Sequence, residues 1–487
     1  MKKIGNFIKK HDNIYVMLIF AILFIIPSFG IKLMLTDELW NFSNVYKMIN
    51  GYKIYQECNV IITPLFFYIG KILLKVIGAN FFGFRIYCIL INACVFTGIY
   101  MLFKSVNINK SKSFLYTVVV LIFCNEIIFW GANYNNLAIA FSIIGIVLLI
   151  KNKNYFWQGL IIFLVFMSKQ NIGVYYAIGI TIARLWVEKD FVKTLKETFI
   201  NGITTILLLS VYLIYMYLNG SIYDFIDLIL LGISEFAEKN ILMYISNMGV
   251  IVFQVVILIF EFIIITNKKI QIEKEVKDNT RILLSISLVF LLIEYPIFNS
   301  AHTVLASMIL IISLITILEK IVIRDVFNKS KIIHIATVIG VFIFMIICAK
   351  NTIWYISMKF ETDTSSPYYG VKIDDETRKS MKNVCNYIEK NQEKGKKTVI
   401  LSYKSDLYLN MFKLSYNKFD LPFLGNLGGR GEQGLIEDLD KLKDTYILIS
   451  KDEPTIQESE KIINYIKDNF NLAGEIDNYY IYESHDM

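Results

Sequence analysis

The sequence predicts a mainly α-helical, polytopic membrane protein with a small α/β domain at its C-terminal end. Three observations predict this fold class. The chain has 487 residues, of which 55% are hydrophobic and only 19% are charged, whereas soluble domains are about 25% charged. Apolar runs long enough to cross a ~30 Å hydrocarbon layer recur along most of the chain. After about residue 355 the composition changes abruptly and polar residues predominate.

About eleven apolar runs have a length close to that of a transmembrane helix. They are residues 14–35, 84–104, 113–130, 134–151, 154–168, 172–187, 198–218, 243–266, 281–298, 301–324 and 333–352. The first run is too long for the apolar part of a cleavable signal peptide and lacks a small-residue cleavage site. We therefore expect it to be the first membrane anchor.

The distribution of basic residues predicts the orientation of these spans. With the N-terminus in the cytoplasm, the loops on that side carry roughly 22 Lys and Arg residues, against roughly 6 on the other side. The net charge of +7 is thereby explained by topology and does not indicate a nucleic-acid partner. We expect a multi-pass protein of the plasma membrane, with its C-terminal domain outside the cytoplasm.

Three segments face outward in this topology. Residues 36–83 are amphipathic, as in helices that lie along a membrane surface, and residues 219–242 form a second outward loop. The third segment is the C-terminal part of the chain. It predicts the domain division, with a transmembrane domain at 1–355 and an extracytoplasmic α/β domain at 356–487. In the latter, helices and short apolar runs alternate. They fall at 375–393, 398–402, 432–443, 445–450, 455–470 and 479–482.

An acidic pair, Asp37-Glu38, comes directly after the first span, at the predicted outer interface. A carboxylate there can act as a general base or a metal ligand close to a lipid-borne substrate. The alternative is that the two acidic residues only mark the edge of the membrane.

The neighbouring residues favour function, because they follow in a particular order. After Asp37-Glu38 come an amphipathic helix, a Gly51-Tyr52 turn, a helix start at Thr63-Pro64-Leu65, and Arg85 at the opening of the next span. This order resembles the C-type superfamily of lipid-dependent glycosyltransferases. It is most similar to the branch of protein O-mannosyltransferases and bacterial lipid A aminoarabinose transferases. The plan of many spans followed by an outward C-terminal domain is also similar.

The resemblance implies roles for five residues. Asp37 would be the catalytic carboxylate with Glu38 in support, and Arg85, Lys169 and His302 would bind the donor phosphate. Each basic residue also has a structural alternative: a side chain that snorkels to the interface for the Arg and Lys, and a structural turn residue for the His.

The second outer loop departs from the family pattern. The family often carries an acidic residue there, whereas this loop contains Asn133, Asn135 and Asn136. Amides can bind a sugar or phosphate but cannot act as bases, so we expect these three to contact substrate. The sequence shows no dedicated metal motif. No cofactor is certain, and a divalent cation remains an open alternative.

The resulting expectation is an inverting transferase that moves a sugar from a polyprenyl-phosphate carrier to an acceptor on the outer face of the membrane. Its partners would be membrane lipid, the lipid-linked donor, and a glycan, lipid or protein acceptor of the cell envelope. Asp37, Arg85 and Lys169 would converge on one outward cavity. The alternatives are a transporter or flippase for lipid-linked sugars, and an inactive membrane scaffold.

Overall fold

The computed structural model describes residues 12–129, 131, 133–152, 155–232, 248–270, 272–295, 298–322, 330–412, 421–452 and 458–484. Two compact units can be separated by their internal contacts. The first, here called the helical unit, comprises Met1–Ile31, Cys88–Tyr212 and Ile241–Trp354. The second, the mixed unit, comprises Lys32–Tyr87, Leu213–Asn240 and Tyr355–Met487.

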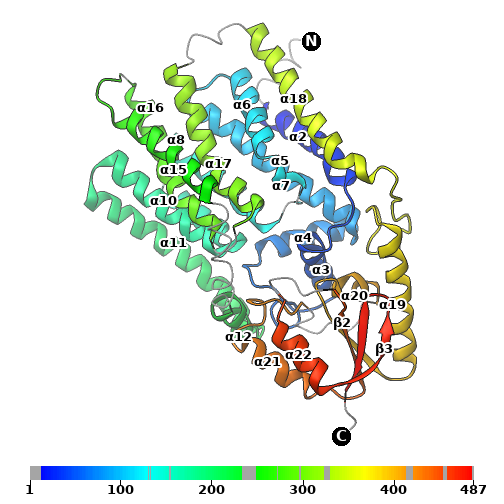
Figure 1. The fold of residues 1–487 in the computed structure, drawn as a ribbon. Helices are drawn as coiled ribbons and strands as arrows, with labels where there is room; N and C mark the ends of the chain where they lie inside the picture. The colour runs from blue at the N-terminus through cyan, green and yellow to red at the C-terminus, as the bar shows by residue number, and fades with distance from the viewer. Residues whose placement is uncertain are drawn as a thin grey trace. The chain divides into compact units, whose positions relative to one another are not determined.

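The helical unit consists of helices throughout its described length (Figure 1). They are α2 (Asp12–Gly30), α5 (Phe81–Ser105, which begins in the mixed unit), α6 (Lys110–Phe123), α7 (Glu126–Phe129), α8 (Tyr134–Asn152), α9 (Tyr155–Ser168), α10 (Gln170–Glu188), α11 (Phe191–Leu218, which ends in the mixed unit), α15 (Met248–Thr266), α16 (Lys274–Phe290), η2 (Leu291–Glu294), α17 (Ser300–Ile317), η3 (Leu318–Val322), α18 (Ser330–Thr352) and η4 (Ile353–Tyr355).

Seven helices of the described part are long and apolar enough to cross a membrane. They correspond to the predicted spans that begin at 14, 84, 134, 198, 243, 301 and 333, the start of the 243 span lying outside the described residues. The other four predicted spans coincide with α6, α9, α10 and α16. A helix of 14 residues, such as α6 or α9, is about 21 Å long at 1.5 Å per residue. The protein is therefore membrane-embedded by composition, while the count of eleven stays a prediction.

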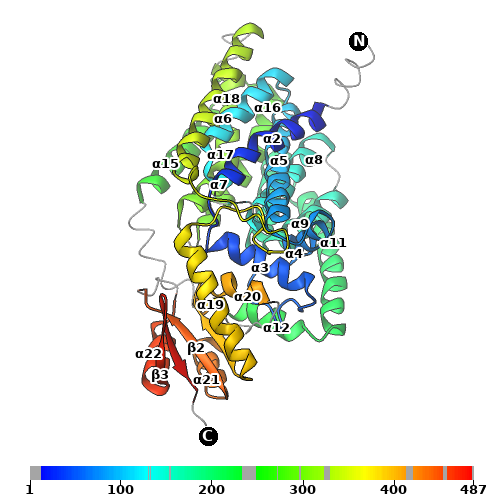
Figure 2. The same cartoon turned by 90° about the vertical axis from the view of Figure 1, so that its right-hand side faces the viewer.

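Neighbouring helices in the helical unit pack in pairs. α10 packs against α16, α8 against α9, and α18 against α6, and the last pair runs side by side in Figure 2. Glycine also allows α10 to approach α9, because a Cβ atom at Gly173 of α10 would overlap the backbone of Phe166 in α9. The two helices are joined only through Lys169, so this contact fixes the position of that lysine.

The mixed unit combines the amphipathic segment after the first span with the C-terminal residues. Its helices are α3 (Asp37–Ile49), α4 (Leu65–Ile77), α12 (Ile222–Ile226), η1 (Asp227–Leu231), α19 (Asp375–Glu393), α20 (Ser405–Phe412), α21 (Gly431–Leu439) and α22 (Glu460–Asn469). Its strands are β1 (Lys397–Leu401), β2 (Thr445–Ser450), β3 (Asn471–Ile476) and β4 (Tyr479–Glu483).

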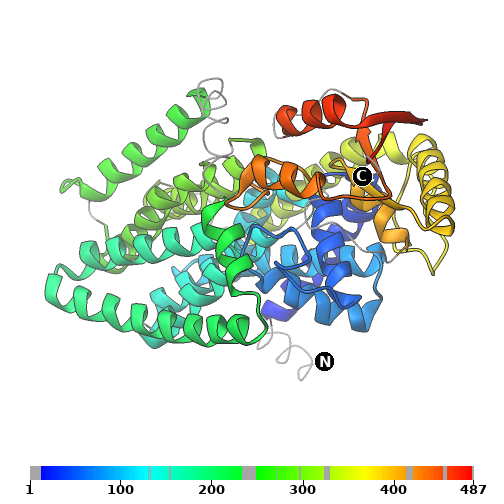
Figure 3. The same ribbon diagram turned by 90° about the horizontal axis from the view of Figure 1, so that it is seen from below.

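The four strands form one mixed sheet in the order β1-β2-β4-β3. β1 and β2 are parallel, and β4 is antiparallel to both of its neighbours. Leu448 of β2 lies opposite Ile400 of β1 and Ile481 of β4, at the centre of the sheet. The strands lie between α22 on one side and α19 on the other (Figures 1 and 3). The predicted small mixed α/β arrangement near the C-terminus is thereby confirmed.

Helix α19 begins at an acidic cap. The Asp374 carboxylate accepts a hydrogen bond from the backbone N–H of Thr377 at 2.8 Å and lies 3.4 Å from the Lys32 ammonium. Burial alone would raise the pKa of Asp374, but these hydrogen bonds and the lysine charge outweigh it and hold the pKa below its usual value. The cap therefore contributes stability in its ionised form.

Several predicted segments extend beyond the described residues. They include the N-terminal cytoplasmic segment up to residue 11, the outward loop from residue 233 onward, and the start of the helix expected at 455–470. The division at residue 355 stays a prediction as a domain boundary, and the contact-based mixed unit also contains residues 32–87.

Candidate functional site

The acidic pair opens helix α3, and the two carboxylates point to different surroundings. Asp37 and Glu38 occupy the first turn of the helix, where negative charge is favoured by the helix dipole. Asp37 is exposed, whereas Glu38 is buried. Only Asp37 is therefore placed where it can meet a substrate from solvent.

Glu38 forms a two-pronged ion pair with Arg85. The Nε and Nη2 groups of Arg85 donate to the two carboxylate oxygens of Glu38 at 2.9 and 3.0 Å. Nη2 also donates to the carbonyl of Lys32, and one oxygen of Glu38 accepts the backbone N–H of Met34. Arg85 is only 1% exposed. Paired N–H groups in this planar arrangement are the strong form of the Arg–carboxylate contact.

This pair anchors the start of α3 to the start of α5. The sequence predicts Arg85 as a ligand of the donor phosphate, but two of its donor groups bind Glu38 in the structure. The geometry favours a positioning role, in which Arg85 and Glu38 hold the helix end that presents Asp37. The phosphate role of Arg85 stays a prediction.

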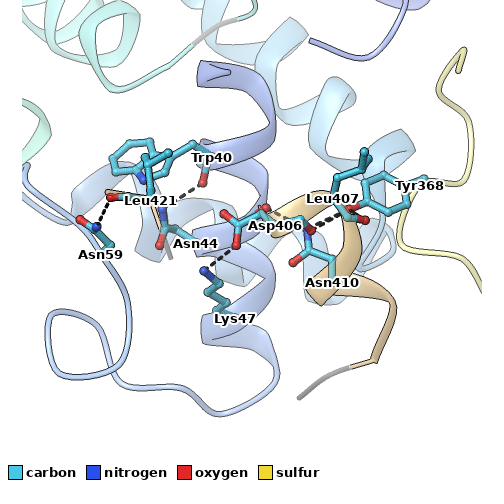
Figure 4. Close-up of polar contacts among 10 residues, drawn as sticks. Trp40, Asn44, Lys47, Asn59, Tyr368, Asp406, Leu407, Asn410 and Leu421 are labelled. Atoms are coloured by element: carbon cyan, nitrogen blue, oxygen red, sulfur yellow. Dashed lines mark hydrogen bonds and ion pairs between the residues drawn. The ribbon is translucent and has the colours of Figure 1, made fainter. Parts of the chain in front are cut away.

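A second buried ion pair links α3 to the C-terminal part of the mixed unit (Figure 4). The Lys47 ammonium lies 2.7 Å from the Asp406 carboxylate, and both residues are buried. Nearby, Asn410 donates to the Ser43 hydroxyl at 2.8 Å, and the Tyr368 hydroxyl lies 2.9 Å from the carbonyl of Asp406. Sequence reasoning missed this set, because the residues that α3 contacts lie more than 300 positions later in the chain.

In the helical unit, Lys169 lies at the junction between α9 and α10. It occupies the N-cap position of α10, where a positive charge opposes the helix dipole. Its ammonium lies 4.4 Å from the centre of the Tyr134 ring, at the start of α8. A half-buried lysine at an unfavourable helix end is a reasonable candidate for binding an anion.

His302 lies in the first turn of α17. Asn299 caps this helix and accepts the backbone N–H of His302 at 2.9 Å. The same Asn299 oxygen lies 2.9 Å from His302 Nδ1, so Nδ1 carries the proton in this arrangement. The predicted residues Lys169 and His302 both belong to the helical unit.

The three asparagines of the second outer loop have different environments. Asn133 caps α8, because its side-chain oxygen accepts the backbone N–H of Asn135 at 2.9 Å. Asn136 is buried and donates to Asn92 at 2.8 Å. Asn135 is also buried, and its side-chain oxygen has no hydrogen-bond partner within the described part of the chain. Substrate binding by the three stays a prediction, and Asn135 is the best placed for it.

Glu126 is an acidic residue that sequence reasoning overlooked. The sequence predicts a span over 113–130, but α6 ends at Phe123 and Glu126 opens the short helix α7. A carboxylate thus does occur in the connection that was expected to hold only amides. One of its oxygens is buried without a hydrogen-bond partner among the described residues. A glutamate inside an apolar run was the available signal, since such residues are costly in lipid.

Metal binding is not indicated by any single cluster. Within the residues described, no three His, Cys, Asp or Glu side chains are grouped so that they could hold an ion. The divalent cation therefore stays a prediction.

Comparisons with known proteins give one informative result. The chain matches no protein-family model and no curated protein sequence. Its structure is similar to the crystal structure of the oligosaccharyltransferase from Archaeoglobus fulgidus in complex with zinc and sulfate, with a TM-score of 0.51 and 11% sequence identity. The similarity covers 90% of this chain and 68% of the archaeal chain. This chain therefore shares the fold of the archaeal protein.

Proposed function

We propose that the protein is a glycosyltransferase that moves a sugar from a polyprenyl-phosphate carrier to an acceptor on the outer face of the membrane. The observation that carries the proposal is the exposed Asp37, held at the start of α3 by the buried Glu38–Arg85 pair. The similarity of the fold to an oligosaccharyltransferase supports it.

The proposed reaction is a direct displacement at the anomeric carbon. An acceptor hydroxyl forms the new C–O bond as the bond between the sugar and the lipid phosphate breaks. The electron pair of that bond leaves with the phosphate, and the hydroxyl proton passes to Asp37. This sequence inverts the configuration of the sugar.

The leaving phosphate gains negative charge during this step. Lys169 is proposed to stabilise that charge. A contribution by His302 requires its imidazolium form, because its Nδ1 hydrogen already bonds to Asn299 and the Nε2 atom of a neutral ring is an acceptor. Fixed cations that face developing charge are among the strongest contributors to catalysis. We also propose that Glu126 takes the place of the acidic residue that the resemblance implies in this connection, while the divalent cation stays a prediction.

Replacement of Asp37 by Asn tests the proposed base. The amide keeps the size of the side chain but cannot accept a proton, so we expect turnover to fall by about 10²–10⁴-fold. The measurement is transfer of labelled sugar by purified protein from a panel of polyprenyl-phosphate sugars.

A matched control is Asp375→Asn. Asp375 is also an exposed aspartate in the first turn of a helix, α19, so its replacement removes the same dipole contact away from α3. We expect near-wild-type turnover for this control. Equal turnover for Asp37→Asn and Asp375→Asn would refute the assignment of the base. Absence of transfer by the wild type from every donor would instead favour the transporter or scaffold alternatives.

A further inference from the structure

Helix α3 carries a row of polar side chains below Asp37. Asn41 and Asn44 follow at spacings of four and three residues, which place all three on one face of the helix. Whereas Asp37 is exposed, Asn41 is 2% exposed and Asn44 is 1% exposed. The row therefore runs from the surface into the interior of the mixed unit.

The hydrogen bonds of these amides fix their orientation. The Nδ2 group of Asn41 donates to the carbonyl of Asp37 at 2.8 Å, and that of Asn44 donates to the carbonyl of Trp40 at 2.9 Å. A backbone carbonyl can only accept, so in each side chain the nitrogen must be the atom beside it. The amide oxygens then point elsewhere, and both are buried without a hydrogen-bond partner among the residues described.

A third amide has the same pattern. Asn59, in the loop after α3, is buried and donates its Nδ2 group to the carbonyl of Leu421 at 3.3 Å (Figure 4). Its oxygen is likewise buried and without a partner in the described structure. The residue before it, Cys58, is close enough to Lys47 and Asp406 for their charges to act on its thiol. Asn59 therefore belongs to the same region as α3.

The three buried amide oxygens can only accept hydrogen bonds, and this limits the ligands that they can bind. A ligand must bring hydrogen-bond donor groups, and the partial negative charge of the oxygens would repel an anion. The neighbouring buried charges are paired, Lys47 with Asp406 and Glu38 with Arg85, so they do not select a cation, and the charge of Asp37 lies at the exposed end of the row. Neutral hydroxyl groups are the donors that fit.

We propose that Asn41, Asn44 and Asn59 form a subsite for hydroxyl groups of a neutral saccharide. The saccharide enters from the exposed Asp37 end, and Asn41 is the first amide that it meets. This inference deepens the proposed function and rests on it, because the proposed function identifies the subsite as the one that holds a sugar acceptor. Binding of the saccharide itself can be measured without any donor.

The test is to measure the binding of neutral methyl glycosides to the purified full-length protein by saturation-transfer NMR. We expect the wild type to bind at least one glycoside, and Asn41→Leu or Asn44→Leu to weaken that binding about tenfold or more. Leucine is close to asparagine in size and removes an unpaired buried acceptor, so the thermal midpoint should stay equal or rise.

The chain offers a matched control in Asn50. Its Nδ2 group also donates to the carbonyl four residues earlier, that of Tyr46, at 3.0 Å, but Asn50 is exposed. Asn50→Leu should leave glycoside binding unchanged. Unaltered binding by Asn44→Leu together with a lower midpoint would show that ordered water pairs the oxygens, and would overturn the proposal. Binding of methylammonium in place of the glycosides would also overturn it.

A second measurement covers the case in which a variant does not fold. For the wild type alone, glycosides that lack one hydroxyl should bind about tenfold more weakly for at least one position. Equal binding of all the deoxy analogues, or no binding of any glycoside, would overturn the subsite. If Asp37→Asn kept full turnover while binding still depended on Asn44, the assigned base would be wrong and the subsite would stand.

Discussion

The buried pair between Glu38 and Arg85 allows the largest effect on stability to be worked out from the structure. Removal of Arg85 leaves a carboxylate in the interior without the two charge-assisted hydrogen bonds at 2.9 and 3.0 Å. Each such bond is worth about 1.5–3 kcal/mol, and loss of one partner of a buried pair typically costs about 3–5 kcal/mol. We therefore expect Arg85→Met to lower the free energy of unfolding by about that amount.

Replacement of both partners should cost much less than either single change. An apolar pair of similar volume is often as stable as a buried ion pair, so Glu38→Leu combined with Arg85→Met should recover most of the loss. The assay is a double-mutant cycle by denaturant titration of the purified protein. The exposed pair of Arg430 and Glu437, 2.8 Å apart with both side chains more than half exposed, is the control and should show little coupling. Additive losses at Glu38 and Arg85 would refute the reasoning.

The same variants separate the two roles considered for Arg85. If Arg85 only positions α3, sugar transfer should return in the double variant together with stability. If Arg85 binds the donor phosphate, as the sequence predicts, the double variant should be stable but inactive. Turnover compared at matched stability decides between them.

Three features of the mixed unit carry further predictions. Asp374→Ala should lower the free energy of unfolding by about 0.5–2 kcal/mol. The folded-state pKa of Asp374 lies below the usual 3.8, so this loss of stability should be complete above pH 3.8 and shrink as the pH falls through the folded-state pKa. A loss that did not depend on pH would contradict this prediction. Gly428 and Gly395 have φ of +70° and +74°, but of the two only Gly428 lies where a Cβ would overlap a neighbour, the Asp227 carboxylate. Gly428→Ala should therefore lower the thermal midpoint more than Gly395→Ala, and this difference between the two variants should disappear in the background of Asp227→Ala. If the difference persisted there, the overlap with Asp227 would not be its cause. Exposed Lys467 tests topology, since Lys467→Cys in a cysteine-free background should react with a membrane-impermeant maleimide in intact cells, and reaction only after lysis would reverse the orientation.

The fold could be predicted to the extent that it depends on local hydropathy. Each predicted span overlaps a helix, and the apolar runs 398–402 and 445–450 are strands β1 and β2. The end of α6 could not be predicted in the same way. Its apolar run continues through Ile127 and Ile128, so hydropathy alone extends the helix past Phe123 and hides Glu126 in a span.

The candidate site was predictable as a set of residues but not as a set of contacts. The resemblance pointed to Asp37 and Arg85 through motif order, and to Lys169 through its position at the outer end of a span. It could not indicate that Arg85 is paired with Glu38, because that contact joins residues 47 positions apart. Pairing of Lys47 with Asp406 was even less accessible, since local periodicity carries no information about partners so distant in the chain.

The acidic dipeptide itself shows why two adjacent carboxylates need not share a function. Consecutive residues on an α-helix point about 100° apart, so a helix that buries Glu38 against Arg85 must turn Asp37 toward another environment. The burial of one carboxylate and the exposure of the other follow from that geometry. A site that needed both groups on one substrate would require them three or four residues apart. The dipeptide is therefore better suited to a division of roles, in which Glu38 fixes the helix and Asp37 carries the chemistry.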